Sequence, residues 1–478
     1  MNSMWLIARE EWRYWVRSRL ARVSVLIFVG LIIASSLFST LQTLDARHQR
    51  LHQQEVAEQT FLSQPARHPH RMVHYGHYAF RPPPPLAVFD PGIDVVTGQS
   101  IFLEGHRQNT AMFADARAQA KAGGFGILTP AMVYQILFPL LLIIIGHDIV
   151  AREREARTLA PLMGQGVTGI TLYCGKALAL LGLVGVLALP VLLVSVMSVL
   201  LGESIPAGLF LTLTYALFLT CWSALLLLVS FAFKTRGIIL AVLMLFWLFG
   251  TLIIPRIAVA TGDASFPTEG KILTDLRMKD DLREIGDGHN DADPTFSKLK
   301  AELLAQYNVG NVEDLPMNFR GVVASTAEAR LTKTLNDYAE KRMERESRQS
   351  RIIRDFGALS PFLAVGHASK SIAGTDLKSH HRFLREAEVL RFGYVQALNE
   401  VHAGQIAYSD DINRSSDQGA EKRTRVDPEN WRVLKQFRFE TSGTNARLAR
   451  AAPSLSFLTI WTLGLLGVGV LLARGASP

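Results

Sequence analysis

ALALLGLVGVLALPVLLVSVMSVLL (Ala177–Leu201) and AGLFLTLTYALFLTCWSALLLLVSFAF (Ala207–Phe233) stand almost next to each other and contain no charged residue. At a rise of about 1.5 Å per residue, a helix formed by either run can cross the roughly 30 Å of hydrocarbon in a bilayer. Backbone polar groups inside lipid must be satisfied within the segment, so these runs are predicted to be helices. The pair therefore places the chain in a membrane.

The same signal recurs on both sides of this pair. We predict six transmembrane helices, at residues 21–42, 128–150, 176–202, 207–233, 237–258 and 454–474. The first is not a cleavable signal peptide, because its charged leader is too long and its apolar run exceeds the usual 7–15 residues or so. Pro190 is expected to kink the third span. The predicted fold class is an all-α membrane protein.

The composition agrees with this division into apolar and polar blocks. Charged residues make up 19% of the 478 residues, against about 25% in a typical soluble domain. The net charge of +8 comes with arginines that flank the apolar runs, which favours a membrane surface over nucleic acid as the partner. The only cysteines are Cys174 and Cys221, in or beside apolar runs, so the polar segments are held by packing rather than by disulfides.

Basic residues mark one side of the membrane. They gather in the N-terminal segment, in the loops after the second and fourth spans, and after the sixth span. The opposite short loop, residues 202–206, has Glu203 and no base. By the positive-inside rule the basic side is cytoplasmic. We therefore expect a bacterial inner-membrane protein with both termini inside and a mainly helical extracytoplasmic domain built from two insertions, residues 43–127 and 259–453.

Residues 1–20 have the pattern of an amphipathic helix. Aromatic residues recur at helical spacing, and arginines lie mostly off that face; the residues concerned are Trp5, Trp12, Trp15, Arg13 and Arg17. An aromatic stripe backed by arginine is typical of a helix in the headgroup layer. The alternative is an ordinary core helix.

The loop at residues 151–175 is the most informative short region. Its charged start consists of Arg152, Glu153, Arg154, Glu155, Arg157 and Thr158, and Leu159 and Leu162 follow as residues available for docking. A charged helix that continues from a membrane span can sit in a groove of a cytoplasmic partner and carry force into the membrane. The alternative is a solvated loop that only fixes topology.

These two regions together resemble the permease subunits of the ABC-2 class of ATP-binding-cassette transporters. The resemblance rests on Arg9-Glu10-Glu11-Trp12-Arg13 with Arg17-Ser18-Arg19-Leu20, and on Arg152-Glu153-Arg154-Glu155-Ala156-Arg157-Thr158-Leu159 closed by Gly175-Lys176. It implies that residues 151–175 contain the coupling helix that contacts a separate ATPase subunit. ATP and Mg²⁺ would be bound by that ATPase, and the permease would pair with a second, identical or homologous, copy.

A narrower resemblance covers the two insertions. The chain is similar to a bacterial subfamily of such permeases with large outer insertions, and the similarity rests on short pieces that include Tyr78-Ala79-Phe80-Arg81-Pro82-Pro83, Asp90-Pro91-Gly92, Leu359-Ser360-Pro361 and Gly374-Thr375-Asp376 followed by His380. The motif residues are Asp90, Pro91, Gly92, Gly374, Thr375, Asp376 and His380. The resemblance does not supply a substrate.

The sequence predicts no catalytic residue of its own. A P-loop needs Gly-x-x-x-x-Gly-Lys followed by Ser or Thr, but Gly175-Lys176 is followed by Ala177 and Gly270-Lys271 by Ile272. ATP hydrolysis is therefore expected in a partner subunit, and no directly bound cofactor is predicted. The spans are almost free of ionisable residues, which argues against a proton-coupled transporter.

Histidines are concentrated in the two insertions. The densest group is His68, His70, His74 and His77, and imidazole is a common ligand for zinc and copper. No His-Glu-x-x-His is present and Pro69 interrupts the group, so we interpret these as surface and packing residues and predict no metal site. Asp376 and His380 lie one helical turn apart, and we expect a structural contact between them.

Three functions remain open at this point. The first is an ABC permease that exports or translocates a substrate, with an ATPase, a second permease and membrane lipids as partners. The second is a subunit that transmits ATP-driven motion to a periplasmic protein without moving cargo, which the size of the insertions favours. The third is a membrane-anchored metalloenzyme that uses the outer histidines.

Overall fold

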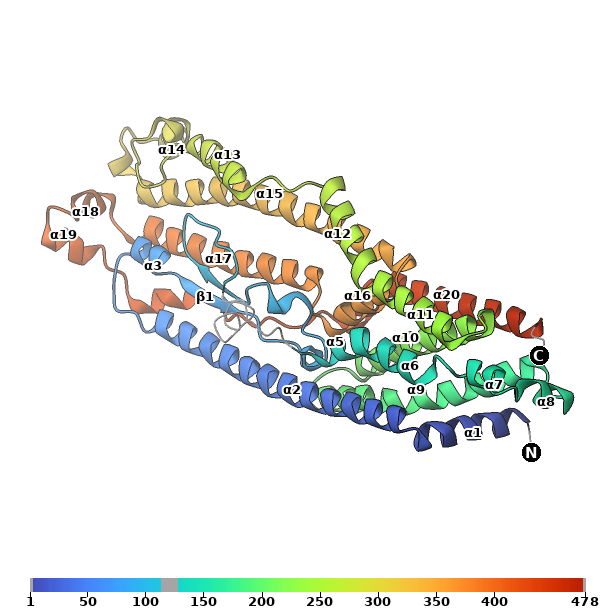
Figure 1. Cartoon of the computed structure of the whole chain (residues 1–478). Helices are drawn as coiled ribbons and strands as arrows, with labels where there is room; N and C mark the ends of the chain where they lie inside the picture. Colours follow the sequence, from blue (N-terminus) through green and yellow to red (C-terminus); the bar gives the residue numbers. More distant parts are fainter. Residues whose placement is uncertain (1–2, 113–127, 476–478) are drawn as a thin grey trace.

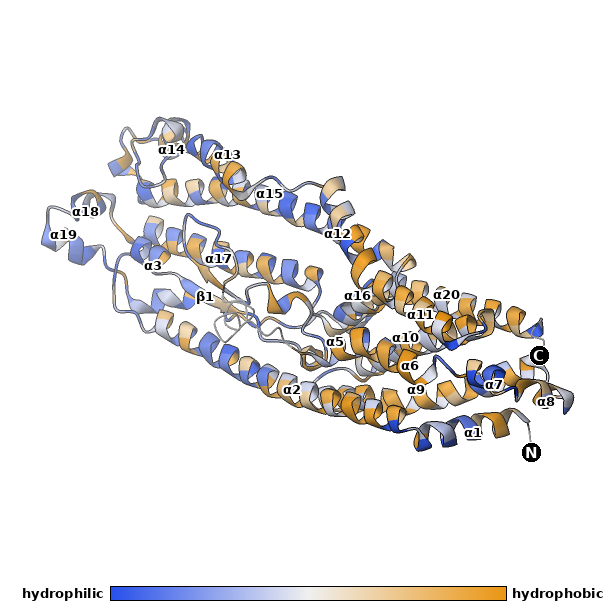
Figure 2. Ribbon diagram, in the orientation of Figure 1, coloured by the Kyte–Doolittle hydropathy of each residue, from blue (hydrophilic) through white to orange (hydrophobic). Residues whose placement is uncertain are grey.

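The computed structural model describes residues 3–112 and 128–475, which form an elongated molecule (Figure 1). One half is a bundle of apolar helices and the other is a polar domain (Figure 2). The last part of the predicted first insertion, residues 113–127, and the first two residues of the predicted N-terminal helix lie outside the described residues.

Six helical stretches in the described residues are long and apolar enough to cross a membrane. Each predicted span overlaps one of them, so the predicted six-helix, all-α membrane fold is confirmed. The stretches are α2 (Arg19–Leu62), Pro130–Glu155, α9 (Gly169–Leu200), α10 (Ile205–Ala232), Arg236–Ser265 and α20 (Thr444–Arg474).

The second and fourth stretches form the centre of the bundle. Both are mostly buried by other helices, whereas the first, fifth and sixth expose most of their surface. Aromatic rings fill the centre: Phe28 contacts Phe138 with ring centroids 5.3 Å apart, and Tyr134 contacts Tyr215 at 5.6 Å. The exposed apolar faces of the outer helices are left for lipid or for another subunit.

Prolines explain the two irregular spans. The second span consists of α5 (Pro130–Met132), a π-helical turn at Val133–Leu137 and α6 (Phe138–Gly146); the fifth consists of α11 (Arg236–Leu248), a π-helical turn at Phe249–Ile253 and α12 (Ile254–Ser265). Pro139 and Pro255 are each the second residue after a wide turn. A proline donates no N–H and crowds the preceding turn, so the helix widens there. In contrast, α9 continues through Pro190.

The polar domain begins with the continuation of α2. At about 1.5 Å per residue, the 44 residues of this helix extend well beyond a bilayer. Strand β1 (His77–Phe80) packs against it and pairs antiparallel with β2 (Ser100–Leu103), with His77 opposite Leu103, while α3 (Pro69–Tyr75) lies against the later helix α17 (Leu377–Gln405). The long helices α15 (Phe319–Asp355) and α17 complete the domain, and α17 supplies Phe383 and Tyr394 to its core.

Short elements complete the far end of the polar domain (Figure 1). In the lobe that contains α13 (Lys271–Arg283) and α14 (Ser297–Tyr307), a small separate core of Phe296, Phe319 and Val323 packs against α14, while α13 lies against α15. The remaining elements are α18 (Tyr408–Asn413) and α19 (Gln418–Arg423), with 3₁₀ turns at Pro85–Val88, Gly92–Val95, Pro294–Phe296, Val312–Asp314, Phe356–Ala358 and Pro428–Val433.

One helix of the second insertion packs inside the bundle. This helix, α16 (Pro361–Ala373), lies against α10 and α20 and buries Ala364 and Ala368 completely. Small side chains allow such close approach between helices. The polar composition of residues 259–453 suggested that this insertion lies wholly outside the bundle. The packing of α16 shows that part of it lies inside. The α20 end of this contact is fixed by a buried ion pair between Arg447 and Glu203.

Candidate functional site

Two short helices come after α6, at the end of the bundle where both termini lie (Figure 1). These are α7 (Ala151–Glu155) and α8 (Leu159–Gly164). The sequence predicts one continuous charged helix here, but Arg157 has φ +57°. This left-handed conformation is unfavourable for a residue with a Cβ and does not fit a right-handed helix. The predicted coupling segment is therefore a helix–turn–helix.

The N-terminal helix α1 (Ser3–Arg17) lies along α9. Glycines on α9 make room for it: a Cβ on Gly175 would lie 2.7 Å from the Cβ of Ile7, and one on Gly182 would lie 3.2 Å from the ring of Trp12. The distance at Gly175 is too short for a real methyl group, so only glycine permits the approach there, whereas at Gly182 a methyl group would require a small shift of Trp12.

Only part of the predicted aromatic stripe of α1 faces α9. Trp15 is buried and Trp12 half-buried, whereas Trp5 is 56% exposed. Arg13 and Arg17 are exposed. The helix thus presents one side to the bundle and leaves Trp5 and the arginines exposed on the other, which is compatible with the predicted interfacial position.

A buried cluster of charges joins α1, α7 and α9. The ammonium group of Lys176 forms ion pairs with Glu11 and Glu153, and Arg152 forms a second ion pair with Glu11. The side chains of Lys176 and Glu11 are 1% and 2% exposed. Removing one member of such a cluster leaves its partner buried and uncompensated, so these contacts hold the three helices in a fixed relation.

Tyr14 extends this cluster toward the loop before α7. Its hydroxyl donates to the carboxylate of Asp148 at 3.0 Å, and the Arg152 guanidinium lies 3.8 Å from the centre of its ring. Partial burial, together with the nearby Asp148 carboxylate, raises the pKa of Tyr14. The phenol therefore stays protonated and keeps donating at neutral pH.

The last residues of α7 are tied to the fourth and fifth spans. Arg154 donates to the carbonyl oxygens of Ser230 at 2.9 Å and Phe233 at 2.6 Å, at the C-terminal end of α10. Carbonyls in the last turn of a helix lack partners within that helix, and arginine is a favourable donor to them. Glu155 forms an ion pair with Arg236 at the start of α11.

The turn between α7 and α8 is exposed, as are several residues of α8 and of the loop that follows it. Ala156, Arg157 and Thr158 are exposed, whereas Leu159 is 5% exposed and packs into the bundle core. The expectation that Leu159 is available for docking is therefore wrong, because an apolar side chain that already packs in the core is not available to a partner. Leu162 is half-buried.

The motif residues of the two insertions meet in space. The hydroxyl of Thr375 donates to the carbonyl of Asp90 at 2.9 Å, and the Ile93 N–H donates to the carbonyl of Thr375 at 3.1 Å. Gly92 adopts φ +54° against Thr375. Pro91 precedes it, and the Gly374 carbonyl accepts a hydrogen bond from Arg81 at 3.1 Å. The residues are thus a junction between the insertions.

A chain of hydrogen bonds connects this junction to the spans. The Asp90 carboxylate accepts from Ser369 at 2.5 Å, Ser369 accepts from Tyr215 at 3.0 Å, and Tyr215 accepts from Gln135 at 2.7 Å. Burial raises the pKa of Asp90. The arrangement links two transmembrane helices to the polar domain through α16.

In the part of the chain that the structure describes, Asp376 and His380 meet only through the backbone, where the His380 N–H donates to the Asp376 carbonyl at 3.2 Å, and their side chains are not paired. The Asp376 carboxylate caps α17 by accepting from the N–H of Ser379 at 3.0 Å and lies 3.3 Å from Arg450. The His380 side chain instead lines a cavity of about 580 Å³ between α15 and α17, and burial lowers its pKa to about 4. An N-cap uses the carboxylate locally and turns it away from the ring.

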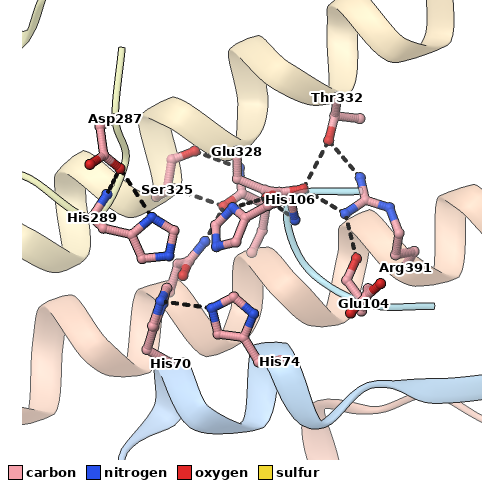
Figure 3. Close-up of polar contacts among 12 residues, drawn as sticks. His70, His74, Glu104, His106, Asp287, His289, Ser325, Glu328, Thr332 and Arg391 are labelled. Carbon is pink, nitrogen blue, oxygen red and sulfur yellow. Dashed lines mark hydrogen bonds and ion pairs between the residues drawn. The ribbon is translucent and has the colours of Figure 1, made fainter. Parts of the chain in front are cut away.

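The histidines divide into groups that the sequence did not separate. His70 and His74 meet His106 and His289, with ligand nitrogens all within 4.8 Å of one another (Figure 3). His77 packs against Phe61 in the domain core, as interpreted from the sequence. Two histidines of the first group come from loops more than thirty and two hundred residues further along the chain.

His68 belongs to a buried ionic network. Its Nε2 lies 3.2 Å from Asp411, and His402 Nε2 lies 2.7 Å from the other oxygen of the same carboxylate. Asn318 also donates to Asp411 at 3.1 Å, and Arg414 lies 3.3 Å away. With so many donors around it the carboxylate is saturated, which favours a structural role over metal binding.

A family described as ABC-2 family transporter protein matches residues 5–316. The chain belongs to this family. A second family, described as a domain of unknown function (DUF3526), matches residues 273–440, which cover much of the second insertion of the permease. No curated protein matches the chain.

The sequence pattern did not reveal how the permease uses Glu11 and Lys176. Glu11 shares a helix face with Ala8 and Trp15, three residues before it and four after it. A carboxylate on an apolar face signals a buried cationic partner, and Lys176 at the start of an apolar run is its natural counterpart. For His106 and His289 no local signal exists, because their loops meet α3 only in the folded permease.

Proposed function

We propose that this permease is the membrane subunit of an ATP-driven exporter in the bacterial inner membrane. A separate ATPase subunit, which binds ATP and Mg²⁺, would contact residues 151–175 from the cytoplasm. A second permease, identical or homologous, would cover part of the exposed apolar surface of the outer helices and complete the translocation path. Both termini would be cytoplasmic, and the two insertions would lie outside.

The observation that carries this proposal is the buried cluster of Glu11, Lys176, Arg152 and Glu153. A loop that only fixes topology needs charge but no buried contacts. Here α7 is joined to α1 and α9 by ion pairs, and to α10 by Arg154. A push on α7 would therefore move the ends of several spans together, as a coupling element requires.

Within the predicted coupling segment, the residues that would contact the ATPase differ from those that hold the segment in place. Arg152, Glu153 and Arg154 point into the permease and would hold the segment in place. The exposed Arg157 and Thr158, with the partly exposed Glu155, are accessible to an ATPase. The left-handed residue Arg157 places this short tip in the turn between α7 and α8.

Charge reversal at the tip tests the proposal. The permease is reconstituted with its ATPase subunit, and ATP hydrolysis is measured with Arg157→Glu. We expect loss of most of the permease-stimulated hydrolysis while the permease itself remains folded. Arg432→Glu is the matched control, because Arg432 is 77% exposed in the polar domain and far from the tip. Stimulation of Arg157→Glu at the wild-type level would contradict the coupling role.

A second candidate is transmission of motion to a periplasmic protein without cargo. The chain of hydrogen bonds from Gln135 through Tyr215 and Ser369 to Asp90 favours it, since it joins the spans to the polar domain. Substrate flux into inverted vesicles would defeat this candidate. A closed interface between the spans with and without nucleotide would support it against export.

A further inference from the structure

Four imidazoles converge at one edge of the polar domain (Figure 3). His70 and His74 come from α3, His106 from the loop after β2, and His289 from the loop between α13 and α14. Their ligand nitrogens lie within 4.8 Å of one another. We propose that these four histidines bind one divalent transition-metal ion of the zinc and copper class.

Carboxylates fix which nitrogen of two rings is available. His106 Nδ1 lies 3.1 Å from Glu328, and the backbone N–H of His106 donates to the same oxygen at 3.0 Å. His289 repeats this arrangement with Asp287, at 3.1 Å from Nδ1 and 2.9 Å from the backbone N–H. A ring that donates its Nδ1–H to a carboxylate keeps a lone pair on Nε2. Metal-binding histidines are oriented in this way.

Helical spacing provides the other two ligands. His70 and His74 are four residues apart, so both rings project from one face of α3, and their Nε2 atoms lie 3.1 Å apart. The helix is held in place at its start, where His68 Nδ1 accepts the His70 N–H at 3.1 Å. The Gly105 N–H donates to the carbonyl of Val73 at 3.0 Å, which fixes the His106 loop against α3.

The Nε2 atom of His106 is a further indication that a ligand binds here. This atom is buried and has no hydrogen-bond partner. The residue also adopts φ +63°, a left-handed conformation that costs energy for a residue with a side chain. Glu328, itself fully buried and paired with Arg391, holds His106 in this conformation. A buried acceptor presented this way is expected to bind something.

The chemistry of the donors selects the class of ion. Four imidazole nitrogens suit zinc and copper, whereas calcium and magnesium require oxygen ligands. Tetrahedral zinc with bonds of about 2.0–2.1 Å needs ligand nitrogens about 3.3 Å apart. His74 and His289 are exposed, so their rings can rotate inward to reach that distance, and the ion can enter directly from solvent. The bound ion would join the α13–α14 lobe to α3.

Metal counting on the purified, full-length permease tests this proposal independently of transport. The protein is stripped with a chelator and titrated with Zn²⁺ or Cu²⁺ alone, and bound metal is measured by mass spectrometry and calorimetry. We expect one ion per chain; because Cu²⁺ binds imidazole sites more tightly than Zn²⁺ in general, the metal present before stripping identifies the ion. His74→Ala and His289→Ala, both at exposed positions, should each weaken binding at least about tenfold. His48→Ala, an exposed histidine on α2, should leave binding unchanged.

The carboxylate at Asp287 provides a sharper test. Asp287→Asn keeps the size of the side chain but removes the charge that orients His289, and should weaken binding about 10–100-fold. Asp314→Asn, on an exposed turn of the same lobe, is its control. Absence of a bound ion above background would overturn the proposal. So would unchanged affinity when His74 and His289 are replaced together, because the ion would then sit elsewhere.

Discussion

Glu11 and Lys176 form a buried ion pair across 165 residues of sequence. It connects a helix at the surface of the bundle to the start of a transmembrane span. Glu153 shares the same ammonium group, so one lysine serves two carboxylates from two different helices. This relationship makes Lys176 the central residue of the region that we propose to meet the ATPase.

Replacing Lys176 by Met should therefore destabilise the permease strongly. Two carboxylates lose their main cation in a buried site, and breaking a buried pair typically costs about 3–5 kcal/mol. Thermal unfolding in detergent, followed by intrinsic fluorescence, measures the loss. Arg13→Ala removes an exposed ion pair with Glu10 and should cost less than about 1 kcal/mol. Equal effects of the two substitutions would mean that the buried cluster does not hold α1.

Gly175 tests the approach of α1 to α9 by sterics alone. A Cβ at this position would lie 2.7 Å from Ile7, so Gly175→Ala must push the helices apart at a cost of about 1–3 kcal/mol. Gly185→Ala, on the same helix with nothing within 4 Å, should be neutral or stabilising by up to about 1 kcal/mol. Melting temperatures of both variants give the comparison. A stable Gly175→Ala variant would show that α1 can shift freely on α9.

His77 should make the polar domain sensitive to acid. Burial lowers its pKa from 6.5 to about 4 in the folded chain, whereas in the unfolded chain it keeps about 6.5. Between these values only the unfolded state binds the proton. Above about pH 6.5 the neutral His77 costs the folded state no stability. As the pH falls toward 4, protonation of the unfolded chain lowers the free energy of unfolding, by about 2 kcal/mol at about pH 5.

His77→Phe tests this acid sensitivity, because it keeps an aromatic ring against Phe61. The free energy of unfolding is measured at about pH 7.5 and about pH 5, and the variant should lose less stability between them than wild type by about 2 kcal/mol. His48→Gln, at an exposed position on α2, should keep the wild-type dependence. An identical pH dependence in His77→Phe and wild type would exclude a role for this imidazole.

The six spans could be predicted because their signal is local. Each run is long and apolar by itself, as Ala177–Leu201 illustrates, and no partner is needed to recognise it. The exposed or buried state of single residues is not local. Leu159 belongs to a charged loop in sequence yet packs into the bundle core, because the left-handed turn at Arg157 redirects the chain.

The candidate sites could likewise be predicted only as far as their signal is local in the sequence. The motif pieces around Asp90 and Thr375 could be singled out, but their contact depends on how the two insertions fold together. His70 and His74 are visible as a pair at helical spacing, whereas His106 and His289 are isolated residues in separate loops. A site whose ligands come from three segments leaves no spacing pattern in any of them, so only the tertiary structure assembles it.

A comparison of Gly92 with Gly166 distinguishes the two reasons why a position requires glycine, which are backbone conformation and close contact with a neighbour. Both adopt positive φ, +54° and +87°, so a Cβ at either position costs about 1–2 kcal/mol through backbone conformation. At Gly166 nothing else lies within 4 Å, but at Gly92 the Cβ would lie 2.4 Å from the carbonyl oxygen of Thr375. Gly92→Ala must also break the hydrogen bond from Ile93 to that carbonyl.

We therefore expect Gly92→Ala to destabilise the permease by about 2 kcal/mol more than Gly166→Ala, since a lost buried hydrogen bond and a steric clash add to the shared backbone cost. Thermal unfolding and limited proteolysis around residues 88–98 report the two effects. If both variants melt at the same temperature, the contact with Thr375 does not join the insertions. The buried pair of Arg81 and Asp94 would then have to hold this segment alone.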